Sequence, residues 1–112
     1  MYQLYSAIAP RVEDFPKLLD KMGELMKEDF DISQDVAKLT APTLIVAGDS
    51  DLFPPSHAVE MFALLGGGMK EPGWDGSGRP ASQLAILPGL THYNIFADPS
   101  LATTALRFLH EP

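Results

Sequence analysis

The sequence predicts an α/β fold in which parallel strands are flanked by helices. Two short apolar runs, residues 43–47 and 84–87, are typical of strands. The first run shows no alternation of apolar and polar residues, which is typical of a strand covered on both faces in a parallel sheet. Segments with helical spacing of apolar residues precede, separate and follow the two runs. Helices that alternate with strands in this way indicate α/β architecture.

The first half of the chain carries two predicted helices before the first strand. Asp14 is expected to cap a helix that begins near Phe15 and Pro16, because proline is tolerated in the first helical turn. A shorter helix is expected over residues 33–39. The earlier of these helices presents one apolar stripe at three- and four-residue spacing. The stripe consists of Phe15, Leu18, Leu19, Met22, Leu25 and Met26.

Two further helices flank the second strand. One opens at residues 54–56 and ends at the glycines of residues 66–68, which accept positive φ. Residues 66–80 are rich in glycine, proline and charge, and are expected to form a long surface loop or small hairpin. Asp98 and Pro99 form an N-cap and first-turn pair for the last helix.

Composition excludes several classes of partner. The 112 residues carry a net charge of −7, whereas nucleic acids and anionic membranes are bound through clustered lysine and arginine. No run is long and apolar enough for a membrane span, and the N-terminus lacks the pattern of a signal peptide. Without cysteine there are neither disulfides nor thiolate metal ligands. We expect a cytoplasmic protein that uses no cofactor and no metal.

Two residues that could carry chemistry follow the two predicted strands. Asp51 comes shortly after the first strand and His92 shortly after the second. Open α/β sheets build their sites at the carboxyl ends of parallel strands, so these side chains are expected to lie close together. A carboxylate on one ring nitrogen fixes the tautomer of a histidine and supports its work as a base. We expect a separation of about 2.6 to 3.2 Å between an Asp51 oxygen and a His92 nitrogen.

A longer pattern surrounds these two residues. The run Ala-Pro-Thr-Leu-Ile-Val-Ala-Gly-Asp-Ser-Asp ends at Asp51 and is followed by Pro54, and the run Leu-Pro-Gly-Leu-Thr-His-Tyr contains His92. With the helix at Asp98-Pro99, this pattern resembles the C-terminal part of the α/β-hydrolases over residues 41–108. It is closest to their esterase and haloperoxidase-like branch. The resemblance implies that Asp51 is the catalytic acid and His92 the catalytic histidine.

The resemblance also implies a partial α/β-hydrolase fold. Residues 1–30 would correspond to the tail of a helical cap, and residues 31–112 to the C-terminal part of the hydrolase core. The two strands would be the seventh and eighth of its sheet. The insertion of residues 66–80 accounts for a spacing between Asp51 and His92 that is longer than usual in this family.

The expected nucleophile of such an enzyme is absent from the sequence. In α/β-hydrolases the serine precedes the acid and the histidine and lies in a Gly-x-Ser-x-Gly turn, which occurs nowhere in these residues. We therefore expect the C-terminal portion of a serine-type hydrolase that acts on an ester or similar acyl substrate and is inactive alone. Whether the chain serves as an enzyme is left open. The alternative is a non-catalytic, self-associating remnant that acts as a binding or structural module.

Partner expectations follow from the small number of strands. Two strands from the middle of a sheet leave unpaired backbone groups on their outer edges. We expect these edges to be covered in a homodimer, by edge pairing or swapping, or by a missing N-terminal half, which in a split enzyme would be a separate polypeptide. A small ester-like substrate is expected only for the completed enzyme.

Other residues with functional side chains have simpler interpretations. His57, at the start of a predicted helix, and His110, near the C-terminus, are interpreted as exposed to solvent. Ser77 lies in a flexible glycine loop and follows the acid, so it is not expected to be a nucleophile. Trp74 in the same loop is expected to pack locally rather than to anchor a partner. Asp49 is interpreted as a turn residue.

Overall fold

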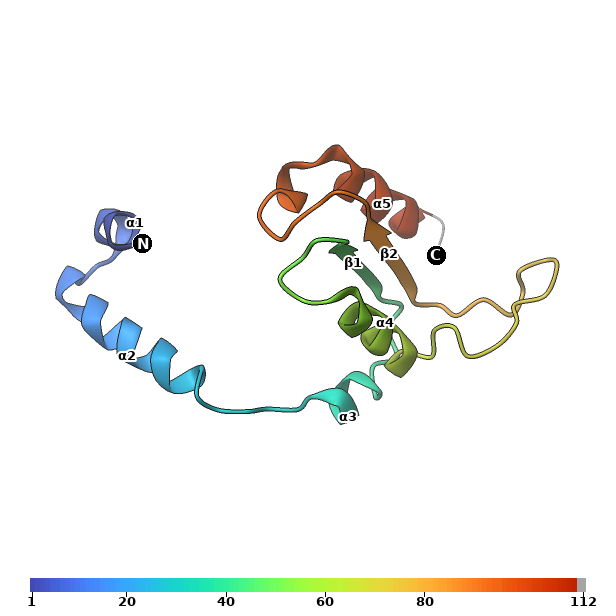
Figure 1. The fold of residues 1–112 in the computed structure, drawn as a ribbon, viewed down its shortest axis with the longest axis horizontal. Coiled ribbons are helices and arrows are strands. Elements are labelled where there is room, and N and C mark those ends of the chain that lie inside the picture. The colour runs from blue at the N-terminus through green and yellow to red at the C-terminus, as the bar shows by residue number, and fades with distance from the viewer. Residues whose placement is uncertain (111–112) are drawn as a thin grey trace. The chain divides into compact units, whose positions relative to one another are not determined.

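The computed structural model describes residues 1–110 and divides the chain into two compact units. The first unit is Met1–Asp31, and the second begins at Ile32. The first contains α1 (Tyr2–Ile8), the 3-10 turn Val12–Asp14 and α2 (Phe15–Leu25). The second contains α3 (Ser33–Val36), β1 (Leu44–Gly48), α4 (Pro55–Leu64), β2 (Gln83–Leu87), the 3-10 turn Ile95–Ala97 and α5 (Pro99–His110) (Figure 1). The assignment of these units to a hydrolase cap and core stays a prediction.

The first unit is organised around one aromatic ring. The rings of Tyr2 and Tyr5 in α1 lie 5.1 Å and 5.2 Å, centroid to centroid, from the ring of Phe15 in α2. Tyr5 also donates a hydrogen bond from its hydroxyl to the carbonyl of Arg11 at 3.2 Å. These contacts hold a short N-terminal helix that the spacing of apolar residues did not predict.

Asp14 does not cap α2 in the expected way. It lies directly before the helix, but its carboxylate makes no hydrogen bond to the first helical N–H groups. The carboxylate instead forms ion pairs with Arg11 at 2.8 Å and with Lys17 at 2.7 Å. The hydrogen bond and the charge of Asp14 raise the pKa of Lys17. The capping prediction was wrong because two cations compete with the backbone for the same carboxylate.

The apolar stripe of α2 is present but only partly covered, because Tyr2 and Tyr5 contact Phe15 while the later residues of the stripe stay partly or strongly exposed. The helix runs from Phe15 to Leu25, and none of its residues is buried. Leu25 and the following Met26 are strongly exposed, at 62% and 85%. The end of the stripe that lies away from Phe15 is therefore largely uncovered in the described residues.

The second unit confirms the prediction of α/β architecture. β1 and β2 form a parallel pair in which Leu44 lies opposite Gln83 and Gly48 lies opposite Leu87. Both strands fall on the predicted apolar runs. A parallel pair requires a crossover connection, which contains α4. This arrangement brings the carboxyl ends of both strands to the same edge.

Helices cover the strand pair on both sides. α4 and α5 contact both strands and lie on opposite sides of them (Figure 1). The core is small, because only Val36, Ala58 and Ile95 are buried apolar residues in the described chain. Residues 44–47 of β1 are half-buried rather than enclosed, so the prediction of a strand covered on both faces is met only in part.

The ends of the helices agree with the glycine and proline pattern, with one exception. Gly66 and Gly68 adopt φ of +83° and +66° just after α4, as expected for a helix stop. Asp98 accepts a hydrogen bond from the Ser100 N–H at 2.9 Å, which confirms the N-cap of α5. The exception is α3, which ends at Val36, with hydrogen-bonded turns rather than helix continuing to Leu39. Residues 66–80 form no helix or strand beyond α4, as predicted.

Candidate active site

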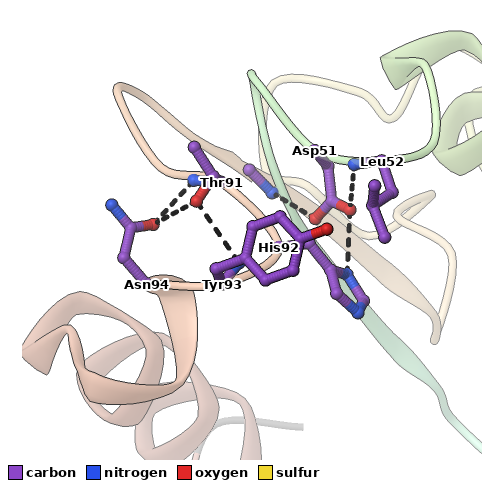
Figure 2. A network of polar contacts seen from close by, with 7 residues as sticks. Asp51, Leu52, Thr91, His92, Tyr93 and Asn94 are labelled. Carbon is purple, nitrogen blue, oxygen red and sulfur yellow. Dashed lines mark hydrogen bonds and ion pairs between the residues drawn. The ribbon is translucent and has the colours of Figure 1, made fainter.

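The parallel pair places Asp51 and His92 on neighbouring loops. Asp51 lies three residues beyond the end of β1, and His92 lies in the loop between β2 and the turn Ile95–Ala97. Nδ1 of His92 is 3.0 Å from Oδ1 of Asp51 (Figure 2). This distance confirms the predicted contact. The Asp51 side chain is 9% exposed and that of His92 is 40% exposed, so the carboxylate is enclosed while the imidazole remains accessible.

The surroundings of Asp51 favour its ionised form. Partial burial, the largest single influence, raises its pKa, but hydrogen bonds outweigh this effect. The N–H of Leu52 donates to Oδ1 at 2.7 Å and the N–H of Gly48 to Oδ2 at 3.4 Å, and His92 adds a further bond and its charge. The pKa of Asp51 is therefore held below its ordinary value.

An ionised Asp51 determines which nitrogen of His92 carries the proton. A carboxylate can only accept hydrogen bonds, so Nδ1 of His92 must be the donor in their contact. In the neutral imidazole the other nitrogen, Nε2, is then unprotonated and able to accept a proton. The pair is thus arranged as a base with a fixed tautomer.

The loop that carries His92 is shaped by Thr91 and Asn94. Oδ1 of Asn94 accepts hydrogen bonds from the Thr91 N–H at 2.7 Å and from the Thr91 hydroxyl at 3.1 Å (Figure 2). The Thr91 hydroxyl in turn accepts from the N–H of Tyr93 at 3.3 Å. This reciprocal pattern resembles a capping box and fixes the turn on both sides of His92. Asn94 was missed from the sequence, although the spacing Thr-x-x-Asn could have indicated it.

Two aromatic rings lie beside the imidazole of His92. Tyr93 and Phe96 meet the ring of His92 edge-on, with centroids 6.0 Å and 5.8 Å away. Both side chains are otherwise exposed, as are Leu52 and Phe53 on the Asp51 loop. Asp51 and His92 therefore lie among apolar side chains that are open to solvent or to a binding partner.

The other candidate residues lie apart from this pair. Within residues 1–110, no hydrogen bond joins His57, His110 or Ser77 to Asp51 or His92. His57 instead stacks loosely on Phe53, with ring centroids 5.6 Å apart. Trp74 is fully exposed, so the expectation that it packs on its own loop is wrong. Backbone turns hold that loop without the help of the indole ring.

No site for a metal or a membrane is evident in the described residues. No three side chains among His, Asp and Glu in residues 1–110 are grouped closely enough to hold a metal ion. Over the same part of the chain, the helices are too short or too polar to cross a membrane. A surface hollow of about 510 Å³ is lined by Phe62 of α4, residues 79–84 and Gly76, and neither Asp51 nor His92 contributes to it. The cytoplasmic location stays a prediction.

Comparison with known proteins adds no relative. No protein-family model, curated protein or solved structure matches this chain. The geometry of Asp51 and His92 is therefore the main support for any functional interpretation.

Proposed function

We propose that this chain is the C-terminal portion of a serine-type α/β-hydrolase that acts on an ester or a similar acyl substrate. The observation that carries the proposal is the 3.0 Å contact between Nδ1 of His92 and Oδ1 of Asp51. These side chains follow adjacent parallel strands, which is where open α/β sheets build their sites. In this reading residues 1–30 belong to a helical cap and the remaining residues to a partial hydrolase core.

The proposed roles follow from the geometry of the pair. His92 takes the proton of a serine hydroxyl on Nε2 and later returns it to the leaving group. Asp51 orients the imidazole and stabilises its protonated form. The serine attacks the acyl carbon, the alcohol leaves, and water then hydrolyses the acyl-serine. The serine and the amides of the oxyanion hole would be supplied by residues outside this sequence, because no Gly-x-Ser-x-Gly occurs within it.

The chain by itself is expected to be inactive. Without the serine step, wild-type chain should hydrolyse p-nitrophenyl esters no faster than His92→Ala. A serine-reactive fluorophosphonate should leave the chain unlabelled. Stoichiometric labelling of Ser77 would contradict this expectation, and a Ser77→Ala variant is the matched control.

The positive test is an assembly that contains a serine. When the chain is purified from its native cells, a polypeptide that carries Gly-x-Ser-x-Gly and reacts with the fluorophosphonate should co-purify with it. Added to that polypeptide, wild-type chain should restore ester hydrolysis, and His92→Ala should lower it by about 10²–10⁴-fold. His57 is an exposed histidine in α4, so His57→Ala should leave the rate of ester hydrolysis unchanged. Equal activity with His92→Ala would refute the proposal.

A second candidate function is a non-catalytic, self-associating module, and the open sheet edge favours it. Thr43 and Asp49 direct their backbone groups to β2, through the bonds Gln83 N–H to Thr43 O and Asp49 N–H to Leu87 O. The alternate residues Leu44 and Val46 therefore direct theirs to the other edge of β1. No further strand in the described residues pairs there. A second copy of this chain could extend the sheet at that edge.

The two functions differ in what covers the edge. A homodimer should bury well over ~1,200 Å² and show twice the chain mass by light scattering across a dilution series. A hydrolase should instead form a one-to-one complex with the serine-bearing polypeptide, or be continuous with such a sequence encoded upstream. A folded chain that stays monomeric, and binds neither a second copy nor the serine-bearing polypeptide, would exclude the self-associating module.

A further inference from the structure

Asp49 connects the two loops that carry Asp51 and His92. Two backbone hydrogen bonds support this connection, one from the Asp49 N–H to the carbonyl of Leu87 at the end of β2, at 3.0 Å, and one from the Ser50 N–H to the Leu90 carbonyl in the loop after it, at 3.1 Å. A third bond runs from the Gly89 N–H to Oδ1 of Asp49 at 2.9 Å. Besides the Asp51–His92 contact itself, only this third bond uses a side chain. It can therefore be removed by a substitution that leaves the backbone bonding groups in place.

The backbone of these loops is built for close approach. A Cβ on Gly48 would lie 2.1 Å from the carbonyl oxygen of Leu90, so only glycine lets the second loop approach the end of β1. Gly89 has φ of +72°, a conformation that other residues rarely adopt, and this turn aims its N–H at Asp49. The sequence of each loop thus fits the bond between Asp49 and Gly89.

We propose that Asp49 is a positioning residue that sets the distance between Asp51 and His92. Asp49 lies two residues before Asp51 in the sequence. Gly89, whose N–H donates a hydrogen bond to the Asp49 carboxylate, lies three residues before His92. The Asp49 bond therefore ties both loops just before the residues that meet. The importance of this bond for catalysis rests on the proposed hydrolase function, whereas its effect on the Asp51–His92 contact does not.

A carboxylate suits this task better than a neutral acceptor. Oδ1 of Asp49 accepts from the Gly89 N–H and also from the hydroxyl of Ser50, at 3.1 Å. Bonds to an ionised acceptor are shorter and stronger than bonds to a neutral one. Asparagine retains an oxygen that can accept from Gly89, so it should preserve part of the effect. Alanine retains none.

The test measures the Asp51–His92 bond directly by NMR. In ¹⁵N-labelled wild-type chain, the Nδ1 proton of His92 should be protected from exchange and shifted downfield by the carboxylate. Asp49→Ala should lose this protected signal while the chain stays folded, and Asp49→Asn should retain it. Asp75→Ala is the matched control, because Asp75 also bonds a backbone N–H, that of Ser77, but within its own loop at 3.0 Å.

A second variant separates position from charge and covers a failure of the first. Asp49→Glu keeps the charge but moves the carboxylate by one methylene, so the protected signal should weaken. Unchanged signals in Asp49→Glu, together with a lost signal in Asp49→Asn, would mean that charge alone is needed and would overturn the positioning role. So would unchanged signals in folded Asp49→Ala. A fall in melting temperature with an intact Nδ1 signal would assign Asp49 a structural role only.

These outcomes are independent of the hydrolase proposal. If the assembled enzyme shows no hydrolysis, the loss of the Nδ1 signal in Asp49→Ala would still establish the positioning role. If the assembled enzyme is active, Asp49→Ala should lower its kcat and leave KM nearly unchanged, with recovery in Asp49→Asn. An active enzyme insensitive to Asp49→Ala would overturn the inference and leave the proposed function intact.

Discussion

Two regions of the molecule are stabilised by different interactions. One is the carboxyl ends of β1 and β2, and the other is the first unit. At the strand ends, polar groups of the chain satisfy one another: Asp49 bonds Gly89, Asp51 bonds His92, and Asn94 bonds Thr91. In the first unit, three rings pack together, but α2 buries none of its residues. The strand ends are specified by contacts within the chain. Beyond Phe15, the apolar stripe of α2 is left partly or strongly exposed.

This difference separates two kinds of specification. Hydrogen bonds fix the geometry of a loop when both partners lie in the same chain, even when the sheet beneath is small. Apolar stripes specify only that something must cover them, because the hydrophobic effect is non-directional. The second unit can therefore present an ordered pair of functional side chains while the first unit leaves its partner open.

The largest expected effect separates the two regions by stability. Ile95 is 5% exposed, so Ile95→Ala should lower the free energy of unfolding by about 2–5 kcal/mol at any protein concentration. Leu25→Ala should cost less than about 0.5 kcal/mol at low micromolar concentration, because Leu25 is exposed. Urea denaturation at two concentrations measures both. If both variants lost the same free energy of unfolding at high dilution, Leu25 would be covered within a single copy of the chain.

The second prediction tests whether a second copy covers the stripe. Met22 is 41% exposed in the second half of α2, and Met22→Lys should weaken self-association by about tenfold or more. Lys21→Met is the matched control, since it changes the charge beside the stripe rather than within it. Light scattering across a dilution series measures the shift from dimer to monomer. A dimer unchanged by Met22→Lys would assign the interface to the edge of β1 alone.

The contrast also explains what the sequence could predict. The strands and the pairing of Asp51 with His92 were predictable because branched apolar runs mark strands and parallel strands end at one edge. Asp49 lies in a turn, as interpreted from the sequence, but its bond to Gly89 could not be predicted, because the two residues lie 40 positions apart and only the fold brings them together. α1 was missed for the same reason, since its tyrosines are held by Phe15 of the next helix.

The third prediction concerns the His92 loop. Asn94→Ala removes the acceptor for both Thr91 donors and should cost about 0.5–1.5 kcal/mol of stability. It should also broaden the NMR signals of His92, because the turn around that residue loses its cap. Thr103→Ala is the control, since the Thr103 hydroxyl only bonds back to Pro99 within α5. Sharp His92 signals in Asn94→Ala would show that the Asp49 bond and the backbone hold the loop unaided.

The smallest effect is a dependence on acid at the start of α5. The hydroxyl of Ser100 first, and its N–H second, hold the pKa of Asp98 below its ordinary value of 3.8. Because the folded chain binds this proton less readily than the unfolded chain, the carboxylate stabilises the fold fully above pH 3.8. This stabilisation is lost as pH falls through the lowered pKa.

Asp98→Asn isolates that contribution. The melting temperature of wild-type chain should exceed that of Asp98→Asn near neutral pH, and the gap should close as the pH falls below the lowered pKa of Asp98. A gap of constant size from neutral pH into acid would mean that the Ser100 bonds stabilise the protonated and ionised forms equally, and that the start of α5 is held by hydrogen-bond geometry rather than by charge.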